Sequence, residues 1–203
     1  MESDKKHLEA FDGDSPKVRE TKKRIAQCLF VLMERDSIDR ITVAEVCAAA
    51  RINRSTFYNH FDGIYDVRAV CEDRIEREVR QVIPFLMGKV LLGDGELAVS
   101  YFEEHMAPYY DYLNVLLNGG DPAFVMRMRD IAHDSLQDTL HINCFSEHQE
   151  LVFNAVAGMQ IGIIGRWLSS GRAIPLADLL DLIGLLVREG PRAALLQEQP
   201  GRR

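Results

Sequence analysis

Apolar residues recur along the chain at spacings of about three and four residues, which is the period of a helix buried on one side. No segment alternates apolar and polar residues for long enough to predict a strand. Ser15 followed by Pro16 is typical of a helix start, and the first helix is expected to run to about Arg35. One face of it carries the apolar residues Val18, Ile25, Leu29 and Leu32.

Two short helices are expected next, followed by a longer one. Thr42 opens the capping box TVAE, in which Glu45 reaches back to the helix start, so a helix is predicted over residues 43–50. Asn53 can cap a third helix that runs to Phe61. After a turn at residues 62–63, a fourth helix is expected, which Pro84 bends or ends. Its apolar stripe consists of Val67, Cys71, Ile75 and Val79.

The remainder of the chain predicts four further helices, over residues 96–117, 123–140, 147–170 and 176–188. Gly-rich or Pro-containing breaks separate them at residues 93–95, 118–122 and 170–175. The fold class is therefore all-α, with about nine helices in two layers. We expect a disordered tail at residues 1–14, a helix-turn-helix module at 15–62, and a helical bundle at 63–203 that dimerises.

The second and third helices, joined by a tight turn, match the helix-turn-helix pattern. At about 100° per residue, Phe57 and Phe61 fall on the side that would pack against the first two helices, together with apolar residues of the second helix and the turn. The opposite side of the third helix gathers groups that can bond base edges or phosphates. They are Arg54, Ser55, Thr56, Tyr58, Asn59 and His60.

The net charge of −7 is unevenly distributed. Residues 15–61 hold nine Lys or Arg against five acidic residues, whereas the chain on either side is acidic. This distribution fits nucleic-acid binding by one end of the molecule, and it equally fits an ordinary solvated surface.

Several other classes of protein receive no support from the sequence. Cys28, Cys47, Cys71 and Cys144 have no CxxC spacing, so we interpret them as reduced thiols in a cytoplasmic protein. The N-terminus lacks the apolar core of a signal peptide. The apolar run around residues 151–165 contains Asn154 and Gln160, and we expect it to fall short of a membrane span.

The stretch ITVAEVCAAARINRSTFYNHFDGIYDV, residues 41–67, resembles the N-terminal signature of the TetR/AcrR family of bacterial transcriptional regulators. The similarity covers about residues 17–67, and STFYNHF is its most diagnostic part. It implies an all-α homodimer that binds a palindromic double-stranded DNA operator, with a ligand pocket in the C-terminal bundle. It also implies a repressor released by a small-molecule effector.

Carried over position by position, the resemblance implies phosphate contact by Thr42 and backbone contact by Tyr58 and His60. The recognition-helix positions are then Arg54, Ser55, Thr56 and Asn59.

Two residues depart from the family pattern. Arg51 stands in the turn where members usually have Gly, which implies modest strain or a slightly different turn. Ile64 stands where members usually have a Lys that meets a phosphate. These departures leave open a second hypothesis, in which a regulator-like adaptor or coactivator acts mainly through a protein partner.

The helices over residues 147–170 and 176–188 carry apolar residues on more than one side. One side can face the same subunit, and the other predicts a two-fold interface between subunits, in which Gly158 and Gly162 permit close approach. The alternative is a pair of fully buried helices in a monomer. The expected dimerisation residues are Val156, Met159, Ile161, Ile164, Leu179, Ile183 and Leu186.

The family resemblance places a ligand pocket among the middle helices, where large apolar side chains recur. Such a stripe alone is typical of an ordinary core, but in this position it is compatible with a bulky apolar effector. The expected lining residues are Phe102, Met106, Tyr109, Tyr110, Phe124 and Met128.

The sequence predicts neither an enzyme nor a cofactor site. It contains no Gly-rich phosphate loop and no nucleophile elbow, and its histidines do not have the spacing of a metal site. We therefore expect no catalytic residues, no metal and no cofactor.

Overall fold

The computed structural model describes residues 14–92, 96–119 and 122–191. These residues form α-helices α1 to α9 and two short 3-10 helices, with no strand among them, which confirms the predicted all-α fold. Residues 1–13, most of the predicted disordered tail, lie outside the described part of the chain.

The N-terminal module consists of α1 (Pro16–Met33), a 3-10 turn (Ile38–Arg40), α2 (Val43–Ala50) and α3 (Arg54–Tyr58). Side chains cap these helices as predicted, because the Ser15 hydroxyl accepts from the amide of Val18 and Asn53 Oδ1 accepts from the amide of Thr56 at 2.6 Å. The third helix is three residues shorter than expected. Beyond Tyr58 the chain continues as a turn, in which the Phe61 amide still donates to the Phe57 carbonyl at 3.0 Å.

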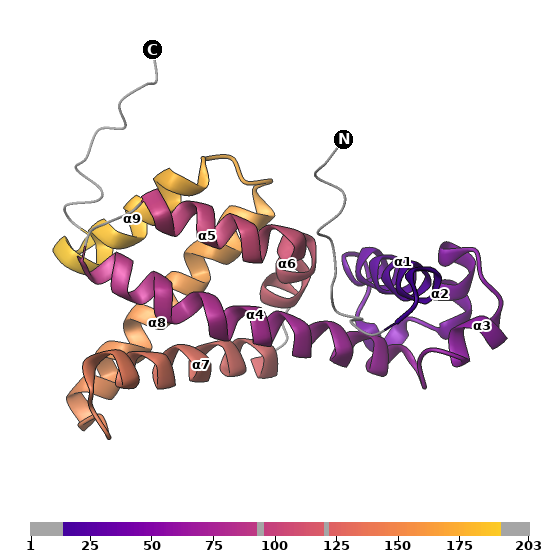
Figure 1. Ribbon diagram of the computed structural model, residues 1–203, viewed down its shortest axis with the longest axis horizontal. Coiled ribbons are helices and arrows are strands. Elements are labelled where there is room, and N and C mark those ends of the chain that lie inside the picture. Colours follow the sequence, from indigo (N-terminus) through magenta and orange to yellow (C-terminus); the bar gives the residue numbers. More distant parts are fainter. Residues whose placement is uncertain (1–13, 93–95, 120–121, 192–203) are drawn as a thin grey trace, which may run out of the picture.

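Helix α4 (Ile64–Leu92) runs from the module into the bundle (Figure 1). It does not end at Pro84, because apolar side chains on both sides of this residue hold the helix against the bundle. Val82 is buried, and Ile83 and Leu86 pack against the same core. The prediction that Pro84 could end the helix is thus wrong.

The predicted single helix over residues 96–117 is divided in the structure. Helix α5 (Glu96–Met106) stops at a 3-10 turn (Ala107–Tyr109), and α6 (Tyr110–Asn118) follows. Pro108 explains the interruption, because it has no amide proton and disfavours the helical conformation of the residue before it.

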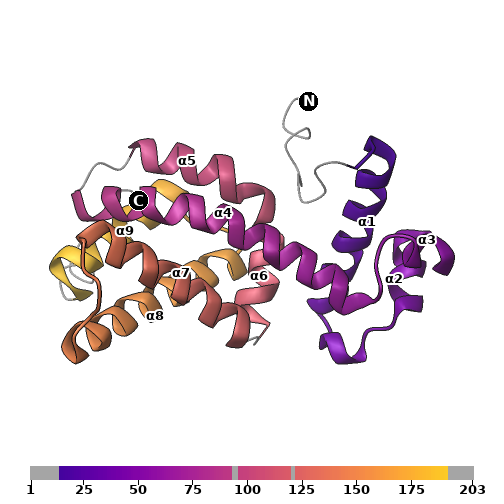
Figure 2. The same ribbon diagram turned by 60° about the horizontal axis from the view of Figure 1, so that its bottom comes forward.

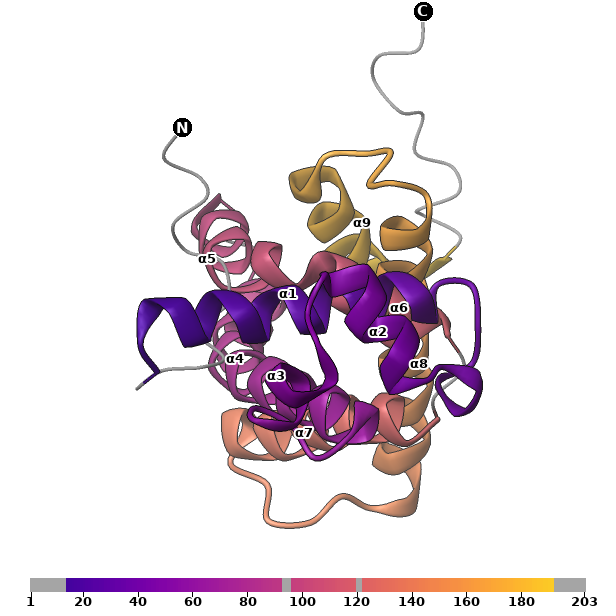
Figure 3. The same cartoon turned by 90° about the vertical axis from the view of Figure 1, so that its right-hand side faces the viewer.

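The last three helices agree with their predicted ranges within two residues: α7 (Pro122–Leu140), α8 (Glu147–Ser169) and α9 (Leu176–Glu189). Helix α4 packs against α5, α7 and α9, and α6 packs against α8. Figure 2 shows α5 on one side of α4 and α7 with α8 on the other. The view from the module end places α1, α2 and α3 in front of this bundle (Figure 3).

A continuous apolar core joins the module to the bundle. Helix α1 packs against α2, α4 and α6. Its Phe30 ring meets the Tyr112 ring of α6 edge to face, with the centroids 4.5 Å apart. The DNA-binding module predicted from the sequence is therefore in direct contact with the bundle.

Helix α8 is apolar, and most of it is not covered by its own subunit. Its best window has a mean hydropathy of 1.3, so by length and composition alone it could cross a membrane, a property that core helices of globular proteins share. Only 28% of that window is buried inside the chain. A core helix of a monomer would be mostly buried, so much of α8 lacks a cover within one subunit.

Candidate nucleic-acid interface and ligand cavity

Helix α3 is anchored on one side and open on the other. Phe57 is fully buried and Phe61 is 3% exposed, and both belong to the core formed with α1 and α2. Tyr58 is 55% exposed. The other predicted contact residues divide into the exposed Arg54, Ser55 and Asn59 and the half-buried Thr56 and His60. Four of these six residues, Arg54 to Thr56 and Tyr58, thus lie on α3, while Asn59 and His60 follow in the turn directly after it.

The turn before α3 contains Arg51 in the left-handed conformation, with φ 52° and ψ 48°. Its amide donates to the carbonyl of Ala48, and the next amide, that of Ile52, donates to the carbonyl of Cys47 at 3.0 Å. This is the conformation in which Gly is favoured at the end of a helix. The strain predicted at Arg51 is therefore present.

Thr42, the predicted phosphate ligand, already uses both of its donors. Its amide donates to Glu45 Oε2 at 2.8 Å, and its hydroxyl donates to the same oxygen at 2.7 Å. These hydrogen bonds lower the pKa of Glu45, which keeps this carboxylate negative. A phosphate at Thr42 would therefore have to displace Glu45 from these donors.

Ile64 is not presented to a phosphate. It is the first residue of α4, only 8% exposed, and packs into the core of the module. This chain therefore uses for packing the position at which the family resemblance implies a phosphate-binding Lys. The charged residue in the first turn of α4 is Asp66, whose carboxylate accepts from the amide of Asp62 at 3.0 Å.

An apolar cavity of about 550 Å³ lies inside the bundle, between α4 to α9. Three of the predicted ligand residues, Phe102, Met106 and Met128, line it. Its few polar neighbours include Arg129, His148 and Gln160. Sequence reasoning missed most of the wall, because an apolar stripe does not reveal which of its residues border an empty space. The missed residues include Val79, Leu86, Leu113, Val152 and Phe153.

The other three predicted ligand residues lie elsewhere. Phe124 is fully buried in the core, and Tyr109 is 4% exposed and accepts a hydrogen bond from Arg74 Nε at 3.1 Å. Neither lines the apolar cavity, so their assignment as ligand residues is not supported. Tyr110 lines a second, separate cavity.

The predicted dimerisation residues face different surroundings. Leu179 and Ile183 are buried in their own subunit and, with Val156, Ile161 and Ile164, line the apolar cavity. Met159 and Leu186 are half-buried and do not line it. The uncovered side, called the outer face of α8 below, consists of Leu151, Ala155, Gly158, Gly162 and Arg166.

Within the described ranges, no group of three or more His, Cys, Asp or Glu residues is placed to hold a metal ion.

The chain matches no protein-family model and no curated protein sequence. Solved structures do resemble it. A TetR-family transcriptional regulator from Streptomyces coelicolor is 22% identical, with a TM-score of 0.51 over 81% of this chain and 77% of that one. A TetR transcriptional regulator from Streptococcus agalactiae is 21% identical, with a TM-score of 0.53 over 84% and 95% of the two chains.

A third similar structure is the fatty acid degradation regulator FadR from Bacillus halodurans. It is 12% identical, with a TM-score of 0.53 over 88% of this chain and 98% of that one. At sequence identities this low, the similarity is one of fold, that is, of how the helices are arranged. The chain has the fold of TetR-family transcriptional regulators.

Proposed function

We propose that the protein is a sequence-specific DNA-binding transcriptional regulator of the TetR type. The observation that carries this proposal is α3, which is anchored by buried Phe57 and exposes a row of polar side chains above it. A helix so mounted fits the major groove of B-DNA. The locally basic charge of residues 15–61 would favour the encounter with DNA.

The side chains of α3 and of the turn that follows it suit two different tasks. Arg54 and Asn59 are exposed and can bond guanine and adenine in a bidentate manner, so we assign base reading to them. Ser55, Thr56, Tyr58 and His60 can donate to phosphates and would fix the register of the helix on the duplex. Thr42 would join them if Glu45 moved away from its hydroxyl.

An apolar small molecule is the proposed effector. The cavity of about 550 Å³ is large enough for a metabolite-sized ligand, and its wall is mostly aliphatic and aromatic. Arg129, His148 and Gln160 could bond one polar end of such a molecule. Because the wall includes α4, which begins at the module, binding there would change DNA affinity and release a repressor.

A homodimer in the cytoplasm completes the proposal. The outer face of α8 is uncovered and contains Gly158 and Gly162, beside which a Cβ atom would meet no other atom within 4 Å. Two copies of this face can approach closely about a two-fold axis. A dimer would present two α3 helices, which fits a palindromic operator.

A second candidate function is that of an adaptor which acts through a protein partner. It is favoured by Thr42, whose donors are engaged by Glu45, and by the start of α4, where a buried Ile64 and acidic groups replace a cation. Each of these features weakens phosphate contact.

Selection of duplexes from a random DNA pool by the purified protein distinguishes these functions. A regulator is expected to enrich a palindromic motif, with affinity that falls steeply with salt because phosphate contacts release counterions. Enrichment of no motif, with only weak binding common to all sequences, would favour the adaptor.

A further inference from the structure

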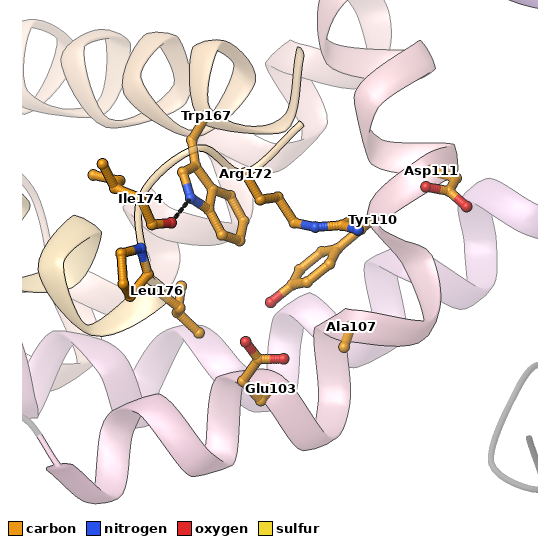
Figure 4. Close-up of a pocket in the computed structure, with 9 residues that line it drawn as sticks. Glu103, Ala107, Tyr110, Asp111, Trp167, Arg172, Ile174 and Leu176 are labelled. Carbon is orange, nitrogen blue, oxygen red and sulfur yellow. Dashed lines mark hydrogen bonds between the residues drawn. The ribbon is translucent and has the colours of Figure 1, made fainter. Parts of the chain in front are cut away.

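A second cavity lies outside the apolar one and shares no wall residue with it. It has a volume of about 430 Å³ and opens between α5, the start of α6, the end of α8 and the turn before α9 (Figure 4). Its wall is polar and aromatic on one side and apolar on the other. The residues used below are Glu103, Tyr110, Asp111, Trp167, Arg172 and Leu176.

The Tyr110 hydroxyl is an unsatisfied group in this wall. Tyr110 is 6% exposed, and among the described residues its hydroxyl makes no hydrogen bond of standard geometry, although it interacts at longer range with the Glu103 carboxylate. Figure 4 shows the hydroxyl directed into the cavity, on the side of the Glu103 carboxylate. Burial raises the pKa of Tyr110, and the Glu103 charge raises it further, so the hydroxyl stays protonated. A buried hydroxyl without a partner is unfavourable, and a polar ligand would satisfy it.

The charges of the wall favour a cation. The Glu103 carboxylate faces the cavity beside the Tyr110 hydroxyl, and the Asp111 carboxylate lies at the rim, directed away from it (Figure 4). Among the described residues, neither acid has an ion pair. Arg172 already lies over the Tyr110 ring, 5.2 Å from its centroid. Arg172 therefore occupies one face of this ring, which leaves the hydroxyl end for a ligand.

The aromatic side chains provide a fixed surface for the body of a ligand. The Trp167 indole donates to the Ile174 carbonyl at 2.8 Å and meets the Tyr110 ring edge to face, with centroids 5.3 Å apart. Leu176 continues this surface on the apolar side. The indole is thus held in place by a hydrogen bond and by ring packing, and it borders the cavity.

We propose that this cavity binds a small organic cation. Its ammonium group lies between the Glu103 carboxylate and the Tyr110 hydroxyl, and its body lies against Trp167 and Leu176. The site is independent of the proposed function, because it requires neither DNA nor the apolar effector.

Trp167 is the only tryptophan of the chain, so its fluorescence reports this cavity directly. The probe is benzylamine, a primary amine that is protonated at neutral pH. Benzyl alcohol and benzoate have the same ring with a neutral and an anionic group. We expect benzylamine to change the fluorescence saturably, with an affinity at least about tenfold higher than that of the other two compounds.

Two pairs of variants locate the binding. Glu103→Gln is expected to weaken benzylamine binding by about tenfold or more, whereas Glu104→Gln, one residue away and outside the wall, should leave it unchanged. Tyr110→Phe should weaken it, and Tyr112→Phe should not, since Tyr112 packs against Phe30 instead.

The proposal is overturned by any of three results: no saturable response to benzylamine, benzoate binding at least as well, or Glu103→Gln binding like the wild type. None of these results would bear on DNA binding, because the titration is made on the protein alone.

Discussion

Arg51 is the residue at which the sequence departs from what the backbone favours. Its φ of 52° costs an L-residue about 1–2 kcal/mol relative to the right-handed conformation, while glycine adopts it freely. Glycine also has more conformational entropy in the unfolded chain, which offsets part of this difference. We therefore expect Arg51→Gly to raise the free energy of unfolding by only about 0.5–1 kcal/mol. Urea denaturation followed by circular dichroism measures this change.

The matched variant for this position is Arg51→Ala. It removes the same charge but keeps a Cβ atom, so the free energy of unfolding should stay close to that of the wild type. A gain in stability with Ala as large as with Gly would attribute the effect to the charge and not to the backbone.

At the residue scale, the anchor of α3 was predictable and the start of α4 was not. Helical spacing places Phe57 and Phe61 on the buried side, and the structure buries both. Ile64 was interpreted from its position in the family pattern, yet in the structure it is buried in the core that joins the helices. Such tertiary packing leaves no local signal in the sequence.

At the scale of elements, ion pairs join α4 to α7. The guanidinium of Arg127 on α7 bonds Glu72 and Glu76 on α4, and Glu72 is only 8% exposed. Arg127 precedes Met128, which lines the apolar cavity, so these ion pairs link two helices that both contribute to the cavity wall. A ligand that shifts α7 would therefore move α4 as well.

We expect Arg127→Ala to lower the free energy of unfolding by about 1–2 kcal/mol, because the Arg127 side chain is 38% exposed and solvent screens part of the attraction. In a double-mutant cycle with Glu76→Gln, the coupling energy should be about 1 kcal/mol. Chemical denaturation of the four proteins gives this value.

The control for this cycle is Arg129→Ala. Arg129 lies on the same helix and is 39% exposed, but its partners are Asp130 and Asn154, not residues of α4. Arg129→Ala should lower the free energy of unfolding by less than about 0.5 kcal/mol. If Arg127→Ala and Arg129→Ala lowered the free energy of unfolding equally, the assigned ion-pair link between α4 and α7 would be contradicted.

Element boundaries followed the sequence where a side chain marks them. Ser15, Thr42, Asn53 and Ser146 each cap the helix that follows. The prolines were harder to interpret, because Pro108 interrupts a helix and Pro84 does not. The difference depends on packing around each residue, which the sequence alone does not show.

At the scale of the whole molecule, a substitution on the outer face of α8 tests whether the protein is a dimer or a monomer. Glutamate has a higher helix propensity than glycine, so Gly158→Glu would stabilise an isolated subunit by about 0.5–1 kcal/mol if this face met only water. If the face pairs with a second copy, the same change places charge and bulk in the interface. We expect folded monomers from this variant and dimers from the wild type, as measured by light scattering.

Met126→Glu is the control for the dimer, since Met126 is 52% exposed on α7 and lies outside that face. It should leave the molecular mass unchanged. A wild type that is monomeric at micromolar concentration would contradict the proposed dimer.

The cavities belong to the whole molecule and could not be located from the sequence. The apolar one requires six helices, α4 to α9, so no single stripe contains it. The polar one combines Tyr110 with residues more than fifty positions later in the chain, such as Trp167. The helix-turn-helix, by contrast, is formed by adjacent residues, and its local pattern was sufficient to predict it.

The central claim, that α3 reads DNA, is tested most directly by the affinity of wild type and Asn59→Ala for a selected duplex and for its single-base variants, measured by fluorescence anisotropy. Loss of the bidentate contact should reduce discrimination at one base pair of each half-site by about 1–3 kcal/mol. Gln27→Ala, which removes an exposed amide from α1, should retain the wild-type preference. If Asn59→Ala and Arg54→Ala both discriminate among these duplexes as the wild type does, α3 does not read the operator.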